Sequence, residues 1–416
     1  MALNLTSFDA ALKEYYTDQA VENMVYKKNP ALALIPKRED FYGRNLPIPI
    51  VYGNPQGRSA DFTRAQTRST SESSRLKEFL LTRVQDYGIA TIDNETMEAS
   101  KNDAGAFMSA ATTEIDGIIN SVTRSLATAM YRGGFGNIGT IATGGISTTF
   151  ITLANVEDIT NFEVGMELVL SASESGNTLR ALGSSANGLI VTAVNRVTGV
   201  LTFGFNVTDA TNGIPTAAAG DVIFVRGDRQ DSATPAREKV AGFDAWCPST
   251  TPTSTSFFGV DRTSDPTRLG GIRYDASALP IEEGLIELAT LIAREGGQPD
   301  HCFMNFSKYA ALEKALGAKV QYADLAVGEI AFRGIRVNGP AGEIKIVPDQ
   351  NCPINRMYML QLDTWVLASL GKMVRVIDTD GNKMLRQASA DGVEVRYGYY
   401  ANIGCKAPGW NGVGLL

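Results

Sequence analysis

The chain has 416 residues, 44% of them hydrophobic and 20% charged, so it can bury a substantial core in two or three domains. Its formal net charge is -7 and it has no long run of Lys or Arg, which argues against a protein built to grip duplex DNA tightly. No stretch has the roughly 20 apolar residues that a membrane span needs, and the start lacks a signal-peptide pattern.

The first 75 residues combine one helical pattern with a long extended excursion. A cap at Thr6–Asp9 and apolar residues at helical spacing predict a helix over Ala11–Lys27, which the prolines that follow break. Leu46–Ile50 is typical of a strand, and its two prolines confine it to a sheet edge or an isolated hairpin. Ser69–Ser74 is polar, and we expect it to be flexible. This excursion has too few apolar residues to pack on itself.

A strand and then a long helix are predicted next. Phe79–Ile92 alternates like a strand. From Asn94 to Arg132 apolar residues recur on one helical face, and a helix of that length would extend on the order of 55 Å. It ends at Gly133-Gly134, as a helix stop should.

The composition changes abruptly between Gly134 and about Asp228, where Gly, Thr, Ala, Asn and Val dominate and lysine is absent. Short alternating runs separated by turns predict a compact all-β insertion, and the pattern leaves open whether it is an immunoglobulin-like sandwich or a closed barrel. The runs are Thr149–Leu153, Met166–Leu170, Gly188–Val194, Val200–Phe205 and Asp221–Val225.

From Asp231 onward the pattern is α+β. Helices are expected over Pro280–Glu295 and Ser307–Leu316. Strands are expected over Cys302–Asn305, Ile335–Val337, Glu343–Val347, Met357–Leu362, Met373–Ile377 and Val393–Tyr399.

Several local motifs suggest chemistry that their context does not support. Gly134, Gly136 and Gly139 match a dinucleotide-binding loop, but that loop must follow a strand and open a helix, whereas here a helix precedes it. His301 is the only histidine, and its neighbour Cys302 would point to the opposite face of a strand, so we expect no catalytic pair there. We therefore expect no catalytic residue and no enzyme.

Metal and cofactor sites are not expected either. The cysteines never form a CxxC pair, and we expect them to be reduced and buried; they are Cys247, Cys302, Cys352 and Cys405. Asp378–Asn382 is acidic, yet it lacks the downstream Glu of a calcium loop and reads better as a hairpin turn. Arg226-Gly227-Asp228 matches a cell-adhesion tripeptide, which we interpret as a chance loop sequence.

Local phrases and their order resemble tailed-phage capsid proteins. The phrases are Phe257–Arg262, Asp265–Gly271, Gly342–Asp349 followed by Cys352-Pro353, and Tyr399–Ile403. Together with the order of predicted elements, they resemble the Hong Kong ninety-seven type capsid fold of tailed phages and herpesviruses, over nearly the whole chain apart from the insertion. The implied class is α+β, with an N-terminal arm, an extended loop, a peripheral domain with a long spine helix, and an axial domain, here with an all-β insertion domain.

This resemblance implies boundaries for the parts. The arm would span residues 1–40, the extended loop 41–78, the peripheral domain with its spine helix 79–133, the insertion domain 134–230, the axial domain and its connections 231–374, and the return to the peripheral domain 375–416. The axial domain itself would cover roughly Asp265 to Val374.

The resemblance also implies a major capsid protein that self-assembles into the pentamers and hexamers of an icosahedral phage head enclosing double-stranded DNA. An extended loop with few contacts of its own should gain order on a neighbouring subunit. Its arginines can pair there with carboxylates, and the candidate inter-subunit contacts are Arg44, Arg58, Arg64, Arg68 and Arg75. Some members cross-link through a lysine in this loop, but none occurs between Lys37 and Lys77, so we expect a non-covalent shell.

Partners follow from the same resemblance. No charged helical segment precedes the arm, which implies a separate scaffolding protein. A portal would occupy one vertex, and the insertion would lie on the outer surface, where it contacts adjacent capsomers or holds a decoration protein. An acidic interior would keep contact with packaged DNA loose. The expected location is the virion capsid, assembled in the host cytoplasm, with no membrane contact and no cofactor.

Three alternatives stay open from the residues. An encapsulin-like compartment shell would share the fold but need no scaffold. A β-rich tail or adhesin protein would suit the Gly- and Thr-rich middle, although the long helix and the α+β second half disfavour it. A hydrolase with a lid-like loop would require a triad or metal cluster, and the sequence offers none.

Overall fold

The computed structural model describes residues 29–94, 104–185, 187–253, 256–316, 322–327, 330–378, 381–387 and 391–416. They form two compact units, each assembled from separate stretches of the chain. The first unit takes the chain up to Leu34, Val84–Val240 and Ser369–Ala401, and the second takes Ile35–Arg83, Ala241–Ala368 and Asn402–Leu416. The helix predicted over Ala11–Lys27 lies outside the described residues.

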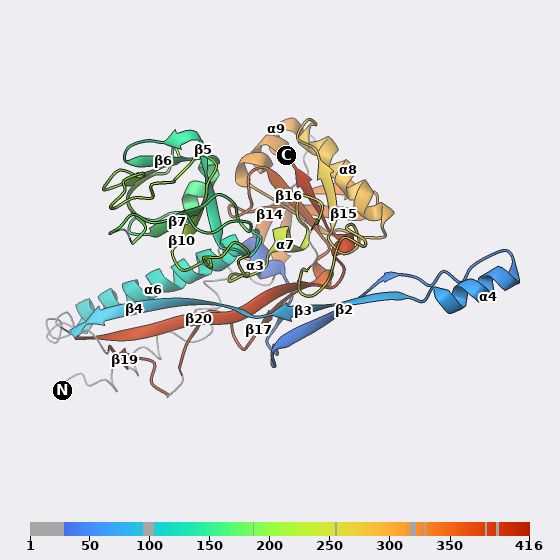
Figure 1. The fold of residues 1–416 in the computed structure, drawn as a ribbon, viewed down its shortest axis with the longest axis horizontal. Helices are drawn as coiled ribbons and strands as arrows, with labels where there is room; N and C mark the ends of the chain where they lie inside the picture. The colour runs from blue at the N-terminus through green and yellow to red at the C-terminus, as the bar shows by residue number, and fades with distance from the viewer. Residues whose placement is uncertain are drawn as a thin grey trace. The chain divides into compact units, whose positions relative to one another are not determined.

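The first unit contains the predicted long helix, α6 (Ala104–Ala129), whose 26 residues extend about 39 Å. It ends three residues before the predicted Arg132, and a turn leads on to the two glycines. Strand β4 (Val84–Asp93) pairs antiparallel with β20 (Gly392–Cys405), as Figure 1 shows. Gly88 lets α6 lie close, because a Cβ there would be 2.6 Å from Ile118 Cγ2.

Short strands complete this part of the first unit. Strands β18 (Arg375–Val376) and β19 (Leu385–Arg386) both pair antiparallel with β20. The strand predicted over Met373–Ile377 is therefore confirmed but shorter than expected. The acidic turn predicted from Asp378 lies partly outside the described residues. Helix α3 (Pro30–Leu34) precedes the second unit in the chain.

The insertion is a closed barrel, which decides between the two architectures that the sequence left open. Its strands follow the order β10-β5-β6-β9-β8-β7 around the wall. They are β5 (Asn137–Ile146), β6 (Phe150–Leu153), β7 (Glu167–Ser171), β8 (Leu189–Asn195), β9 (Val200–Phe203) and β10 (Val222–Val225), with the 3-10 helix η1 (Val156–Asn161) between β6 and β7. Side chains such as Ile151, Leu168 and Leu201 fill the interior.

Five of the six barrel strands coincide with the predicted runs, and β5 was missed. The glycines of β5 hide the alternation, and Gly139 together with Gly136, which directly precedes the strand, explains the false nucleotide-loop match. Gly136 has φ +83°, and a Cβ there would lie 2.6 Å from the carbonyl oxygen of Asp228. A Cβ on Gly139 would lie 3.1 Å from the ring of Phe162. These glycines allow close packing where the chain enters the barrel.

The second unit is α+β, as predicted. A seven-stranded mixed sheet has the order β11-β21-β16-β12-β15-β14-β13. The strands are β11 (Ile272–Asp275), β12 (His301–Met304), β13 (Tyr322–Val327), β14 (Ile330–Gly339), β15 (Gly342–Pro348), β16 (Arg356–Leu360) and β21 (Gly412–Leu415). Helices α8 (Ile281–Arg294) and α9 (Phe306–Leu316) were both predicted, and Leu288, Ile292 and Leu312 join the core with the strands.

Smaller elements of the second unit were not predicted. They are β1 (Lys37–Arg38), which pairs in parallel with β17 (Trp365–Ser369), the short helix α7 (Phe243–Trp246), and the 3-10 helices η3 (Leu362–Thr364) and η4 (Pro408–Trp410). The last four residues of β20 also belong to this unit.

A separate two-stranded sheet forms from β2 (Asn45–Gly53) and β3 (Arg75–Thr82), and helix α4 (Phe62–Ser71) lies beyond it in the connecting loop (Figure 1). The predicted strand over Leu46–Ile50 is confirmed as part of an isolated hairpin. The first three residues of Ser69–Ser74 form the end of α4, and the flexibility expected for this stretch stays a prediction. The Asp61 side chain caps α4 by accepting a hydrogen bond from Thr63 N at 2.9 Å.

Candidate interaction surface

The hairpin segment, Phe41–Thr82, has one buried and one exposed face. Side chains alternate along paired strands, so every second residue faces the same side. Ile48, Ile50, Phe79 and Leu81 are buried within the second unit. The opposite face exposes an apolar row consisting of Pro47, Pro49, Val51, Leu76 and Leu80. Val51 and Leu76 face each other across the strands and are 60% and 62% exposed.

An aromatic cluster fixes the base of the hairpin segment. The ring centroid of Phe79 lies 5.0 Å from that of Trp246 and 6.0 Å from that of Phe257, both edge-on. The guanidinium of Arg262 lies 4.1 Å above the Phe257 ring. Trp246 Nε1 donates a hydrogen bond to the carbonyl of Ile403 at 2.9 Å. Such aromatic pairs add to the burial energy of the rings, so this base is rigid.

A strained turn also holds β3. Phe258 has φ +47° and Gly259 has φ +83°, the backbone of a type I′ turn, and Phe257 and Val260 exchange both of their main-chain hydrogen bonds. The carbonyl of Phe258 accepts a hydrogen bond from Leu80 N at 2.9 Å. A positive φ at a bulky residue is uncommon and persists only where surrounding contacts enforce it.

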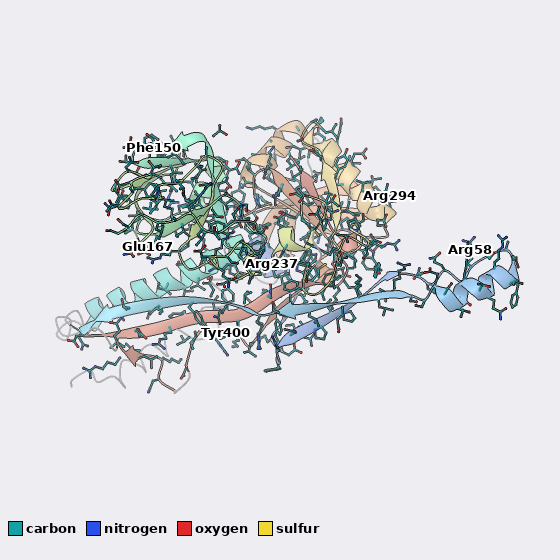
Figure 2. All side chains as sticks on the ribbon, viewed as in Figure 1. Arg58, Phe150, Glu167, Arg237, Arg294 and Tyr400 are labelled. Carbon is teal, nitrogen blue, oxygen red and sulfur yellow. The ribbon has the colours of Figure 1, made fainter. Side chains whose placement is uncertain are left out.

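All five predicted contact arginines are exposed, and the structure separates them into two groups. Arg75 Nη2 lies 3.2 Å from Glu72 Oε2, and Arg64 Nε lies 3.7 Å from Asp61 Oδ2. No ion pair occurs for Arg44, Arg58 or Arg68 within the part of the chain that the structure describes. Figure 2 labels Arg58 in the loop beside α4. Six Lys and Arg against three Asp and Glu give residues 41–82 a net charge of +3, whereas the whole chain carries -7.

Polar contacts join the barrel to α6 within the first unit. Arg124, Thr128 and Arg132 follow one another at intervals of four residues and so lie on one face of α6 and the turn after it. Arg124 pairs with Glu163, Thr128 Oγ1 donates to Asn161 Oδ1 at 3.1 Å, and Arg132 Nη2 lies 2.7 Å from Asp158 Oδ1. Arg196 Nη2 of the barrel also pairs with Glu163, at 2.9 Å. Polar side chains outside the hydrophobic core of the barrel thus attach the barrel to α6.

A buried ionic cluster lies in the same unit. Lys239 Nζ is 2.8 Å from Asp86 Oδ2 and 3.0 Å from Asp228 Oδ1. Ser125 donates a hydrogen bond to Asp86 at 2.6 Å, and the hydroxyl of Tyr399 lies 3.5 Å from the same carboxylate. Burial raises the pKa of Asp228. Burial alone would lower the pKa of Lys239, but the two carboxylates more than offset this and the pKa is raised. Because the Asp228 carboxylate forms an ion pair with Lys239, the structure favours the interpretation of Arg226-Gly227-Asp228 as a chance match.

The residues considered for catalysis are not brought together. His301 is buried and stacks on Phe303, with Nδ1 3.3 Å from an Asp300 carboxylate oxygen but poorly aligned for a hydrogen bond. Burial raises the pKa of Cys302 to about 12, and of Cys247 likewise, so neither thiol supplies a thiolate at neutral pH. All four cysteines are buried, and none forms a disulfide.

The described residues contain neither a candidate metal cluster nor a helix suited to a membrane. No group of three or more His, Cys, Asp or Glu side chains gathers there in a way that could hold a metal ion. Among the helices so described, none has the length and apolar character that crossing a bilayer requires.

The sequence reasoning missed the exposed apolar row and the Lys239 cluster. Alternation over Arg75–Thr82 could have revealed the first, whereas nothing local signals the second.

Comparison with known proteins gives structural similarity without sequence similarity. Neither a protein-family model nor a curated protein matches the chain. The structure is similar to the cyanophage A-1(L) capsid asymmetric unit, with 11% identity, a TM-score of 0.48, and 93% of this chain and 92% of that chain covered. For the capsid of an empty GTA particle these values are 10%, 0.44, 94% and 96%. For the holo-SrpI encapsulin complex from Synechococcus elongatus they are 8%, 0.39, 92% and 86%.

Proposed function

We propose that this chain is a shell subunit, the major capsid protein of a tailed bacteriophage with the Hong Kong ninety-seven type fold. The observation that carries the proposal is the hairpin segment, whose base is packed while its far half exposes cationic and apolar side chains. A two-stranded sheet is marginal in water without a third element to cover it. A function that requires a neighbouring subunit accounts for this exposed surface.

The other parts support the same proposal. The order of elements along the chain is the one that the capsid fold implies, with a hairpin, a long helix beside β4 and β20, a mixed α+β sheet, and a return strand. In this proposal α6 is the spine helix, and the seven-stranded sheet with α8 and α9 is the axial domain around which five or six copies gather. The closed barrel is the added outer module.

The mechanism is assembly through non-covalent contacts. Arg44, Arg58 and Arg68 would pair with carboxylates of a neighbouring copy, since the chain outside residues 41–82 carries a net charge of -10. Lys77 is the only lysine of the hairpin segment, and its Nζ donates to the carbonyl of Asp261 at 3.2 Å. This engagement fits a shell without covalent cross-links.

Partners and location belong to the proposal as well. A separate scaffolding protein would direct closure, a portal would replace one vertex, and the barrel would contact neighbouring capsomers or a decoration protein. The packaged DNA would touch an acidic interior loosely. Assembly would take place in the host cytoplasm before packaging.

The first test is expression of the chain with and without a candidate scaffolding protein, followed by size-exclusion chromatography and negative-stain electron microscopy. Closed shells, pentamers or hexamers are expected. Closed shells that form without any scaffold and then enclose a cargo protein would favour the encapsulin-like alternative instead. A stable monomer or trimer under every condition would overturn the shell proposal.

Arginine variants test the mechanism with a matched control. The double variant Arg58→Gln/Arg68→Gln removes two cations that have no ion-pair partner in the described chain, so the concentration needed for assembly should rise about tenfold or more. Arg75→Gln removes a cation already paired with Glu72 and should change assembly less. Equal effects of the two variants would argue against specific contacts from Arg58 and Arg68.

A further inference from the structure

The two outer edges of the hairpin differ in the hydrogen bonds that they can form. In an antiparallel pair, opposed residues alternate between pairs bonded to each other and pairs whose N–H and C=O groups point outward. Pro47 faces Leu80 and Pro49 faces Glu78. Proline has no N–H, and Leu80 N bonds outward to Phe258, so these pairs belong to the outward class. By the same alternation Leu76, opposite Val51, also points outward.

The edge of β2 is therefore poor at accepting another strand. Its outward positions at 47 and 49 offer carbonyl acceptors but no donors. Prolines at such positions are a common way to prevent a sheet edge from pairing. Strand addition to this hairpin is therefore favoured at β3.

The edge of β3 is occupied near the base and open further out. Leu80 N is bonded to Phe258, and the carbonyl of Thr82 accepts a hydrogen bond from Asn402 Nδ2 at 2.7 Å. For the outward main-chain groups of Leu76 and Glu78, the described residues provide no hydrogen-bond partner. These groups lie beside the exposed apolar row, so a protein surface that covers the row would also exclude water from them. Buried peptide groups must be paired, which a neighbouring strand can do.

We propose that the outer edge of β3 at Leu76–Glu78 is a strand-addition site that takes an extended segment of a second copy of this chain. The inference rests on the proposed function, because it assumes that copies of the chain assemble. Charge supports a second copy as the occupant, since the hairpin segment is cationic and the remainder of the chain is acidic. The main chain of Leu76 and Glu78 provides the hydrogen bonds, and Val51, Leu76 and Leu80 provide the apolar contact.

The test is a pair of variants at one position. Glu78→Pro removes the Glu side chain and the outward N–H, at a kind of position where β2 already accommodates two prolines, whereas Glu78→Ala removes the side chain and keeps the N–H. The proline variant should raise the concentration needed for assembly about tenfold, and the alanine variant should leave it nearly unchanged. Tryptophan fluorescence reports whether the base around Trp246 stays folded in both.

Hydrogen exchange gives a second readout on the unmodified chain. The amides of Leu76 and Glu78 should exchange fast in the unassembled subunit and become protected in the assembled particle. If particles form and these amides stay unprotected, or Glu78→Pro assembles as the unmodified chain does, the strand-addition site is wrong while the shell function stands. If the unmodified chain forms no particle under any condition, the shell function itself fails.

Discussion

Replacing Lys239 by methionine should strongly destabilise the first unit. The ammonium lies 2.8 Å from Asp86 and 3.0 Å from Asp228, and its side chain is buried. Methionine keeps a similar length but leaves two largely buried carboxylates, whose side chains are 12% exposed at Asp86 and 24% exposed at Asp228, without a cation. Removing one partner of a buried ion pair typically costs about 3–5 kcal/mol. Because Ser125 still hydrogen-bonds Asp86, most of this loss should arise at Asp228.

The measurement is chemical unfolding of the unassembled subunit followed by circular dichroism, with Asp228→Asn as the matched control. That variant removes the surplus negative charge and leaves the Lys239–Asp86 pair intact, so it should change the free energy of unfolding by less than about 1 kcal/mol. A loss below about 1 kcal/mol for Lys239→Met, or equal losses for both variants, would refute the reasoning.

The pH dependence follows from the direction of the Asp228 shift. Burial raises its folded-state pKa above the unfolded value of about 3.9, so the folded protein binds this proton more tightly. This group therefore disfavours folding at neutral pH, and its penalty declines as pH falls through the folded pKa towards the unfolded value. In Asp228→Asn no such penalty exists, so its stability should not rise in this way as pH falls. The difference in the free energy of unfolding between Asp228→Asn and the unmodified protein should therefore vary with pH across that interval and stay constant above it.

Three further predictions concern packing and thiols. Gly88→Ala should destabilise the protein by about 1–3 kcal/mol, because the new Cβ would lie 2.6 Å from Ile118 Cγ2. Gly117→Ala, on the open side of α6, should instead stabilise it by about 0.5–1 kcal/mol. Thermal unfolding tests the two variants, and shifts of the same sign would contradict the prediction. Phe79→Ala should cost about 3–5 kcal/mol by emptying the aromatic base of the hairpin, and a loss under about 1 kcal/mol in chemical unfolding would show that the base is not packed as described. The cysteines should react with a thiol reagent only after denaturation, and labelling of the folded protein would contradict their burial.

Much of the architecture could be predicted from the sequence, because periodic patterns record which face of an element is buried. The helix ending near Ala129, the strands around Ile151 and Leu168, and helix α8 all carry such patterns. Strand β5 was missed because glycine is frequent in it, and α4 because a fully exposed helix has no apolar stripe.

The candidate surface was only partly predictable for a different reason. The exposed arginines could be named from their position in a loop without a core, but the strand edge became visible only with the register of Pro47 and Leu80. The cluster around Lys239 joins residues from distant parts of the chain, and no local pattern encodes such a meeting. Domain boundaries and partners stay predictions.

The chain enters and leaves the closed barrel at neighbouring points. Its first and last strands pair with each other, so that Asn137 lies opposite Phe224. Excising the barrel would leave two chain ends close enough for a short connection, without stretching α6 or the segment that carries Lys239. Evolution could therefore have acquired this module in one step and could exchange it as a cassette. The same junction offers engineers a place to display a foreign domain whose termini lie equally close together.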